Sequence, residues 1–439
     1  MKKQLNEPTN RRDREASIYT PNTGVHDKKR LKELQALPLD RKININQTRI
    51  LEWYIRWDGS VYVAFSGGKD STVLADMAAR FCKQFGYKLY LLFVNTGLEY
   101  PEIQKFAKTF AEWLRETYCI DVQLDIVRPE MRFDEVLKTY GYPVIGKEVA
   151  EAIFDTRVQS RVTGESVRNT KIYDRYFNPE SEKNKRFPGY CKSKYDALLD
   201  ASFEISHKCC QVMKKNPSKT YEKETGRKPI IGTMTNESKA RKTKWLQHGC
   251  NAFDVKRPTS TPMSFWTEQD VLRYLKEFNI PYCSVYGDIL EKGQPGGCDE
   301  QTSMFDCPGC LESGNALETT GCDRTGCIFC GFGAHLSDDG RFTRLKETHP
   351  RQYDYCINGG EYLWVGYYRE KVRQKRIEFV NEDGSPMSPD EIESFVEQHL
   401  LDPRYTFKKV WQPNKQGLGL GHVFDEINKI YGENFIRYK

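Results

Sequence analysis

The segment Ser-Gly-Gly-Lys-Asp-Ser, residues 66–71, lies between a short apolar run and a helical pattern. A strand that ends in glycines and leads into a helix leaves the first N–H groups of the helix free, beside the positive end of its dipole. Such a turn binds anions, because glycine lets phosphate oxygens approach the backbone closely. Lys69 adds a mobile positive charge, and Ser66 and Ser71 add hydroxyl donors. The segment therefore predicts a phosphate-binding turn.

Two better-known glycine motifs do not match this spacing. A Walker A loop needs four residues between its first glycine and Gly-Lys-Ser/Thr, and a dinucleotide loop needs Gly-x-Gly-x-x-Gly. The plain alternative, a tight strand-to-helix turn without a ligand, stays open because glycine pairs often form turns.

A second set of chemically active residues lies among the fourteen cysteines of the chain. Cys307 and Cys310 enclose a proline and a glycine, which is the tight-turn spacing of a zinc knuckle. The spacing predicts a structural Zn²⁺ held by four thiolates, those of Cys298, Cys307, Cys310 and Cys322. A different division of ligands with the neighbouring cysteines also fits the pattern.

The elements that position these residues alternate between strand and helix. Apolar, β-branched runs at 61–65, 89–94, 122–127 and 228–233 predict buried strands, and helical spacing follows at 71–85 and 101–118. This alternation predicts a parallel sheet with right-handed crossovers. We therefore expect an α/β fold of Rossmann-like type, with helices on both faces of the sheet. A cysteine-rich metal-binding insertion and a mixed, α-rich C-terminal region should follow the sheet.

Length and charge set wider limits. The 439 residues have room for two or three domains at roughly 100–200 residues each. We expect a basic, partly disordered leader at 1–42, a nucleotide-binding domain at 43–290, a metal-binding segment at 291–335 and a C-terminal region at 336–439. Of the net charge of +6, the leader carries +5, from eleven basic and six acidic residues.

The hydropathy pattern bears on the cellular compartment. No apolar run reaches the ~18 residues of a membrane span, and residues 1–41 lack the apolar core of a secretory signal. These observations predict a cytoplasmic protein that does not enter a membrane and whose thiols are mostly reduced.

Ordered motifs resemble one known family. "SGGKDS" resembles the pyrophosphate-binding PP-loop of the adenine-nucleotide α-hydrolase superfamily. Segments 95–102, 208–217, 232–245 and 261–281 resemble, in order, further motifs of the phosphoadenosine phosphosulfate (PAPS) reductase family. Two positions depart from its pattern, because Asn95 stands where Asp is usual and Met234 where Arg is usual.

The resemblance implies roles for individual residues. ATP or a related adenine nucleotide with Mg²⁺ would lie over the C-terminal ends of the strands. The phosphates would contact Ser66, Gly67, Gly68, Lys69, Asp70 and Ser71, of which Lys69, Asp70 and Ser71 are the expected catalytic residues. The adenosine would lie near Asn95, Thr96 and Gly97, and the far side would be closed by Glu237, Ser238 and Arg241.

The resemblance also implies a cluster. The pair Cys209 and Cys210 with the later Cys327 and Cys330 is similar to the 4Fe-4S ligand set of adenylyl-sulfate reductases and of the sulfur-transfer ATPase of DNA phosphorothioation. Four thiolates are what such a cluster needs. Zinc at these four cysteines is the alternative.

Three functions remain in view. The first is an ATP pyrophosphatase-type enzyme that adenylates a substrate for sulfur transfer, as in thio-modification of DNA or tRNA, with a sulfur donor protein as a partner. The second is a phosphoadenylyl- or adenylyl-sulfate reductase, which is disfavoured because the family's Glu-Cys-Gly-Leu-His tail motif has no counterpart after Cys356. The third is a non-catalytic nucleic-acid-binding or regulatory protein that keeps the nucleotide and metal sites.

Overall fold

The structure is a computed structural model that describes residues 26–291, 316–336, 340–359, 361–365, 379–398, 408–412 and 419–439. The chain divides into two compact units, and each is described by itself. Unit 1 comprises Met1–Arg132 and Cys210–Cys327, and unit 2 comprises Phe133–Cys209 and Ile328–Lys439. The domain ranges expected from the sequence stay a prediction beside this division.

Unit 1 is built on a six-stranded sheet with the strand order β3-β2-β1-β5-β7-β6. Neighbours from β3 to β7 pair in parallel, and β6 pairs antiparallel with β7 at one edge. The central strand β1 pairs on both sides, with Val63 opposite Leu91 of β2 and Ile230 of β5. The strands are β1 (Val61–Ala64), β2 (Leu89–Val94), β3 (Val122–Val127), β5 (Lys228–Ile231), β6 (Asn251–Ala252) and β7 (Thr259–Ser260).

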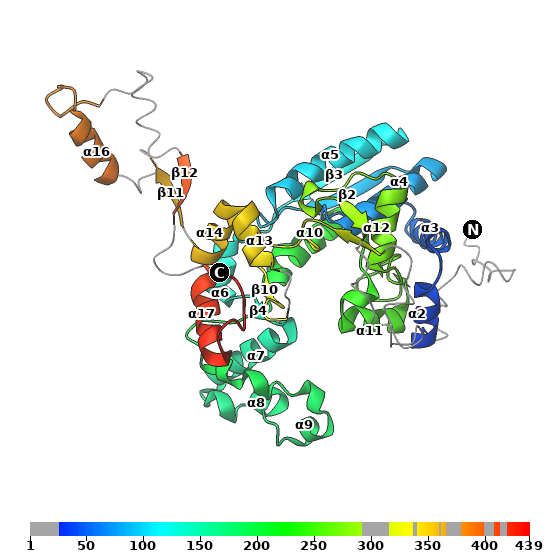
Figure 1. Ribbon diagram of the computed structural model, residues 1–439, viewed down its shortest axis with the longest axis horizontal. Helices are drawn as coiled ribbons and strands as arrows, with labels where there is room; N and C mark the ends of the chain where they lie inside the picture. The colour runs from blue at the N-terminus through cyan, green and yellow to red at the C-terminus, as the bar shows by residue number, and fades with distance from the viewer. Residues whose placement is uncertain are drawn as a thin grey trace, which may run out of the picture. The chain divides into compact units, whose positions relative to one another are not determined.

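Helices flank this sheet, which confirms the predicted α/β class (Figure 1). Right-handed crossovers put α4 (Lys69–Phe85) and α5 (Pro101–Tyr118) on one face, since both connections run in the same direction across the sheet. The return connection carries α10 (Asn216–Thr225) to the opposite face, where Tyr221 packs against Tyr62 and Leu92. Further helices of unit 1 are α2 (Lys28–Gln35), α3 (Leu39–Arg56), α11 (Lys239–His248) and α12 (Glu268–Glu277).

A buried carboxylate joins three helices on the α4 face. Asp76 of α4 is fully buried, and it accepts hydrogen bonds from the Tyr118 hydroxyl at 2.5 Å and the Tyr274 hydroxyl at 2.6 Å. Its second oxygen also pairs with Arg80 Nε at 2.8 Å. A buried charge is stable only when it is paired and hydrogen-bonded, so Asp76 fixes α5 and α12 against α4.

The remaining described segments of unit 1 are short. A π-helical turn (Gln211–Lys215) leads into α10, and a 3₁₀ turn (Thr235–Glu237) precedes α11. Another 3₁₀ turn (Ser284–Tyr286) comes before a two-stranded sheet of β8 (Ile289–Glu291) and β9 (Leu317–Thr319).

Unit 2 is mostly helical in its described part. Gly331 and Phe332 of β10 pair in parallel with Val144 and Ile145 of β4, and β11 pairs with β12 in an antiparallel sheet. Its elements are α6 (Phe133–Tyr140), β4 (Val144–Ile145), α7 (Lys147–Thr163), α8 (Lys171–Tyr176), α9 (Glu182–Arg186), β10 (Gly331–Phe332), α13 (Arg341–Thr348), α14 (Pro350–Asn358), β11 (Glu361–Val365), α16 (Pro389–Gln398), β12 (Lys408–Gln412) and α17 (Leu420–Tyr431).

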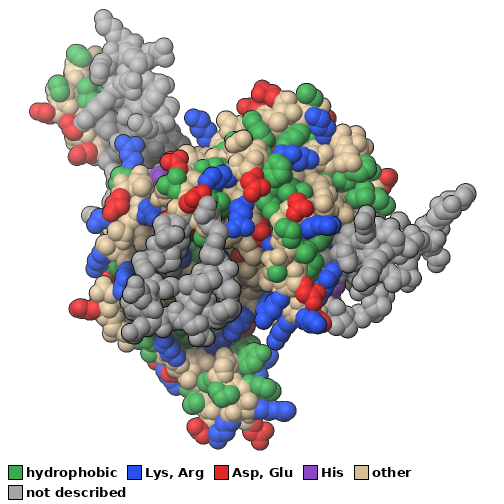
Figure 2. All heavy atoms as spheres, turned by 45° about the vertical axis from the view of Figure 1, so that its right-hand side comes forward, with side chains coloured by type: hydrophobic (Ala, Val, Ile, Leu, Met, Phe, Trp, Pro, Cys, Tyr) green, Lys and Arg blue, Asp and Glu red, His purple; other side chains and the backbone are tan. Residues whose placement is uncertain are grey.

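Two surface features accord with the composition. On the face drawn in Figure 2, Lys and Arg side chains lie among Asp and Glu side chains, as the modest net charge of +6 suggests. Over the described ranges, no helix combines the length and the apolar character that crossing a membrane requires.

Candidate functional site

The glycine turn lies directly after β1, as the sequence predicts. Gly67 has a φ of +71°, which an L side chain rarely adopts, and a Cβ there would come within 3.0 Å of the Ile103 side chain. A Cβ on Gly68 would meet the hydroxyls of Thr325, Ser66 and Tyr286 at 3.1–3.3 Å. Gly67 is therefore favoured by its backbone conformation, whereas a side chain at Gly68 would need the three hydroxyls to move by a few tenths of an ångström.

The two serines of the turn hold its shape. Ser71 Oγ accepts from the Ser66 backbone N–H at 3.1 Å, lies 3.1 Å from Ser66 Oγ, and donates to the Gly68 carbonyl at 2.9 Å. Gly68 is the N-cap of α4, and no side chain caps this helix. Among the described residues, the Lys69 N–H at the start of α4 has the Tyr286 hydroxyl as its acceptor. The end of the helix carries the positive end of the dipole and no acidic cap, which suits a phosphate that takes the place of this hydroxyl.

Lys69 is the first residue of α4 and is almost fully buried. Its ammonium donates to the Asp323 carbonyl at 2.5 Å and pairs with Glu268 Oε1 at 3.0 Å. Glu268 begins α12, whose N-terminus is fixed by the buried ion pair of Lys42 Nζ with Asp270 Oδ2 at 2.6 Å. In this state the lysine is satisfied by protein atoms.

Asp70 follows Lys69 in the chain, and its surroundings raise the pKa of its carboxyl group. Burial, the largest cause, and the Glu268 carboxylate raise the pKa of Asp70, whereas Lys69, Arg324 and Arg241 act to lower it. Its Oδ1 atom is buried and has no hydrogen-bond partner among the described residues. A buried carboxylate oxygen without a donor fits a hard cation such as Mg²⁺.

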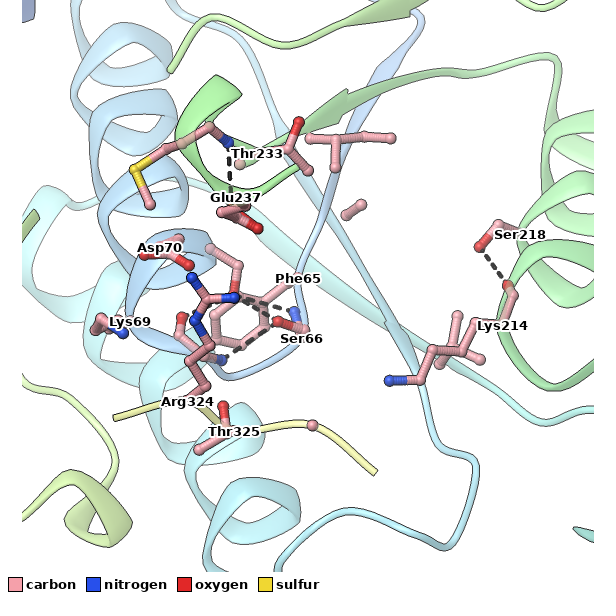
Figure 3. Close-up of a pocket in the computed structure, with 18 of the residues that line it drawn as sticks. Phe65, Ser66, Lys69, Asp70, Lys214, Ser218, Thr233, Glu237, Arg324 and Thr325 are labelled. Carbon is pink, nitrogen blue, oxygen red and sulfur yellow. Dashed lines mark hydrogen bonds between the residues drawn. The ribbon is translucent and has the colours of Figure 1, made fainter. Parts of the chain in front are cut away.

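A segment that the sequence analysis did not single out closes this end of the site. The hydroxyl of Tyr286 accepts from the Lys69 backbone N–H at 3.1 Å and lies 2.6 Å from Thr325 Oγ1. Arg324, next to Thr325, lies close to Ser66, Asp70 and Glu237 in the pocket (Figure 3). We name residues 323–325 the covering segment. The sequence held no local signal for this role, because the contact of Tyr286 with Lys69 joins residues 217 positions apart.

These groups share one cavity of about 1010 Å³ within unit 1. This volume is at the upper end of the range of ~300–1,000 Å³ for ligand pockets. Residues of the glycine turn form one end, and Lys214 and Ser218 on the other side of the cavity come from the π-helical turn and α10 (Figure 3). Strand residues Ala64, Leu92 and Ile231 line the sheet side.

The cavity walls are strongly basic. Among the lining residues the anions are Asp70, Glu99, Glu237 and Glu268, and the cations are Lys69, Lys214, Lys215, Lys219, Lys244, Arg241, Arg257 and Arg324. Eight cations against four anions give this surface a net charge of +4. A polyanionic ligand is therefore favoured over a neutral one.

Of the other residues predicted to bind the nucleotide, two line the cavity and one caps a helix. Glu237 and Arg241 line the cavity and form an ion pair with each other. Burial and the nearby Arg324 lower the pKa of Arg241, although Asp70 opposes this shift. Ser238 instead caps α11, accepting from the Arg241 backbone N–H at 3.3 Å.

Asn95, Thr96 and Gly97 form the turn after β2. Asn95 Oδ1 accepts from the Gly97 N–H at 3.0 Å, and Thr96 Oγ1 donates to Glu99 at 2.6 Å. Asn95, Thr96 and Gly97 are not among the residues that line the cavity, whereas Glu99, two residues further along, is.

The predicted cluster ligands fall in both units. In unit 1, the thiols of Cys210 and Cys327 both interact electrostatically with the amine of Lys214. Burial works to lower the pKa of Lys214, but Cys327, Glu99 and Cys210 together raise it above its ordinary value. Cys209 and Cys330 belong to unit 2. Four thiols are the donor set that a 4Fe-4S cluster takes. In the described part of the chain, however, no three His, Cys, Asp or Glu side chains lie close enough to hold a metal ion.

The predicted zinc set is only partly described. Cys298, Cys307 and Cys310 lie outside the described residues. Cys322 is described, and its thiol lies 3.8 Å from the Tyr100 hydroxyl. The zinc site remains a prediction.

One family model matches the chain. It is the phosphoadenosine phosphosulfate reductase domain, and it covers residues 60–152 and 156–331, which is more than half of the chain. The glycine turn, the covering segment and Cys209, Cys210, Cys327 and Cys330 all lie within the matched residues. No curated protein sequence matches.

Solved structures give weak likenesses. NMN synthetase from Francisella tularensis is 11% identical at a TM-score of 0.28, over 56% of this chain and 72% of that one. The U34-tRNA thiolase NcsA from Methanococcus maripaludis, solved with its 4Fe-4S cluster, is 13% identical at a TM-score of 0.27, over 80% of this chain and 87% of that one. Scores this low bear on neither the fold nor the function of this chain.

Proposed function

The chain belongs to the phosphoadenosine phosphosulfate reductase domain family, and from that premise we propose that it is an ATP pyrophosphatase that adenylates an acceptor for sulfur transfer. At the coarser level it is an enzyme that uses an adenine nucleotide. The observation that carries the finer proposal is the glycine turn at the end of β1, which opens into a basic cavity of about 1010 Å³.

The turn supports cleavage between the α- and β-phosphates. An acceptor oxygen attacks the α-phosphorus, the bond from that phosphorus to the bridging oxygen breaks, and pyrophosphate leaves with the bonding electrons. A sulfur nucleophile then attacks the acceptor atom that carries the adenylate, and AMP leaves with the former acceptor oxygen.

The residues at the turn have distinct tasks in this reaction. The backbone N–H groups at the start of α4 and the ammonium of Lys69 would bind the pyrophosphate part, where negative charge increases as the bond breaks. Ser66 and Ser71 keep the turn in shape through their mutual contact. The guanidinium of Arg324 lines the cavity and is available for the phosphates, since among the described residues it has no ion pair or hydrogen bond of its own.

The cofactors take a limited place in this proposal. Asp70 is the residue that would hold Mg²⁺, which when bound neutralises phosphate charge. Cys209, Cys210, Cys327 and Cys330 stay the proposed ligands of a 4Fe-4S cluster on the ground of their donor chemistry, and no step here passes through it. The zinc set, the sulfur donor protein and a DNA or tRNA acceptor are proposals that come from the family resemblance.

The test is the release of pyrophosphate from ATP by purified protein, with and without candidate acceptors. Lys69→Ala should reduce the rate by roughly 10²–10³, the usual cost of removing one donor to the developing charge. Lys83→Ala, an exposed lysine in the last turn of the same helix, is the matched control. An unchanged rate in Lys69→Ala would remove the proposal, and binding of nucleic acid with no turnover under any condition would favour the binding-protein alternative.

A further inference from the structure

The cations of the cavity are not evenly compensated. At the turn end, Lys69 pairs with Glu268 and Arg241 pairs with Glu237. Four further lining cations are Lys215 and Lys219 from the π-helical turn and α10, Lys244 from α11, and Arg257 from the segment before β7. We name these four residues the basic wall. All four come from elements other than the glycine turn and α4.

The members of the basic wall are close enough to repel one another. Burial, Arg257 and Lys215, in that order, lower the pKa of Lys244. Arg257 has a partner, because its guanidinium donates to both oxygens of Glu222 at 2.6 and 2.8 Å. Within the described ranges, no acceptor lies within hydrogen-bonding distance of the amines of Lys215, Lys219 and Lys244. These three amines are left for a ligand.

A nucleotide at the glycine turn would not use these amines. Its phosphates would engage Lys69, Arg241 and Arg324 at the turn end. A second anion, held in the same cavity, would satisfy the basic wall.

The arrangement of the wall favours a chain of phosphates over a single one. Lys215 and Lys219 are four residues apart, which on a helical stretch puts their Cβ atoms about 5–6 Å apart on one side. Lys244 and Arg257 come from other elements of unit 1, and Lys244 lies near enough to Lys215 and Arg257 to feel the charge of both. Three amines without an acceptor carry more positive charge than one phosphate balances, so several phosphates along a strand suit the wall better than a single one.

We propose that the basic wall binds the backbone phosphates of a nucleic-acid strand, so that the acceptor lies in the same cavity as the nucleotide. This inference rests on the proposed function, because it names the substrate class of that reaction. Lys214 is left out of the wall, since its contacts are with Cys327, Cys210 and Glu99.

The test compares two double variants of the full-length chain. Lys215→Glu with Lys244→Glu reverses two charges of the wall. Lys223→Glu with Lys239→Glu reverses two exposed lysines of α10 and α11 that do not line the cavity. The probes are fluorescein-labelled single-stranded DNA and RNA of mixed sequence, adenosine 3′,5′-bisphosphate, and the non-hydrolysable α,β-methylene analogue of ATP.

The wall variant should bind the labelled strands at least about tenfold more weakly than the parent and show a shallower salt dependence. Two lost phosphate contacts lower the slope of log K against log salt by about 1.4 for single strands. The wall variant should keep its affinity for the ATP analogue, and the control variant should keep both affinities.

Three outcomes would overturn the inference. The first is no binding of either strand by the parent protein, and the second is equal loss in the two double variants. The third is a wall variant that no longer binds adenosine 3′,5′-bisphosphate but binds the labelled strands as the parent does. That result would assign the wall to the 3′-phosphate of a single nucleotide. The proposed function is judged separately by the pyrophosphate assay with Lys69→Ala, so the failure of either idea can be recognised.

Discussion

The ammonium of Lys69 lies 2.5 Å from the main-chain carbonyl oxygen of Asp323. The two residues are 254 positions apart, and Asp323 directly follows Cys322, a predicted metal ligand. The lysine of the glycine turn is therefore in direct contact with the cysteine-bearing part of unit 1.

Replacing Arg324 should weaken nucleotide binding without lowering stability. A hydrogen bond to a charged group contributes about 1.5–3 kcal/mol, so Arg324→Ala should raise the dissociation constant of the ATP analogue by roughly tenfold or more. The side chain is exposed, which predicts an unchanged melting temperature. Calorimetric titration and thermal unfolding measure the two quantities. Arg128→Ala, another exposed arginine of unit 1, is the control, and equal affinities in both variants would contradict the role of Arg324.

Removing the carboxylate of Asp76 should destabilise unit 1. Asp76→Ala leaves Tyr118, Tyr274 and Arg80 without their shared acceptor, and breaking a buried charged pair costs about 3 kcal/mol or more. Tyr118→Phe removes one hydrogen bond to this carboxylate and should cost about 1.5 kcal/mol, the lower end of the range for a bond to a charged group. Urea unfolding followed by fluorescence gives both values. A cost for Asp76→Ala as small as that for Tyr118→Phe would show that the network does not hold these helices.

His335 should make the stability of unit 2 fall with acid. Burial, aided by Lys194, lowers the pKa of His335 below its ordinary value of 6.5, and its ring stacks on Phe435. The unfolded chain then takes up a proton below pH 6.5 while the folded chain stays neutral, so stability is lost as the pH falls from 6.5 toward the lowered value. Denaturant unfolding at pH 7.5 and 5.5 should show a smaller difference in His335→Gln than in the parent. An identical difference would be evidence against this assignment.

The proposed cluster leads to a measurement of iron. Anaerobically purified protein should contain about four irons per chain and show the broad visible absorbance of a 4Fe-4S cluster. About one zinc should accompany them if Cys298, Cys307, Cys310 and Cys322 form a zinc site. Cys210→Ser should lose iron, whereas Cys119→Ser, which changes an exposed free thiol, should retain it. A content of about two zinc ions and no iron per chain would contradict the cluster and indicate a second zinc site at these four cysteines.

Local signals made much of the fold predictable. The strand before Ser66 and the helix after Gly68 follow from an apolar run, two glycines and amphipathic spacing within some twenty residues. The parallel pairing of β1, β2 and β3 follows from the alternation of strands and helices. The antiparallel edge strand β6 has only two residues, too few to produce a periodic pattern.

Other features depended on weaker or distant signals. The short helix α9 begins directly after Ser181, which caps it by accepting from the Asn184 N–H. That serine was a usable signal. The position of Arg324 could not be predicted, because it depends on Tyr286 and Thr325 meeting the turn across more than 200 residues. No local pattern encodes such a contact.

The occupied state of Lys69 means that a nucleotide does not meet a bare cation. An incoming phosphate has to displace a carbonyl oxygen and a carboxylate that already solvate the ammonium, so the affinity measures a swap of partners. Anything that shifts the main chain at Asp323, including the state of the thiol next to it, would change the cost of that swap. ATP affinity would then report on the condition of the cysteines, although no cysteine needs to touch the nucleotide.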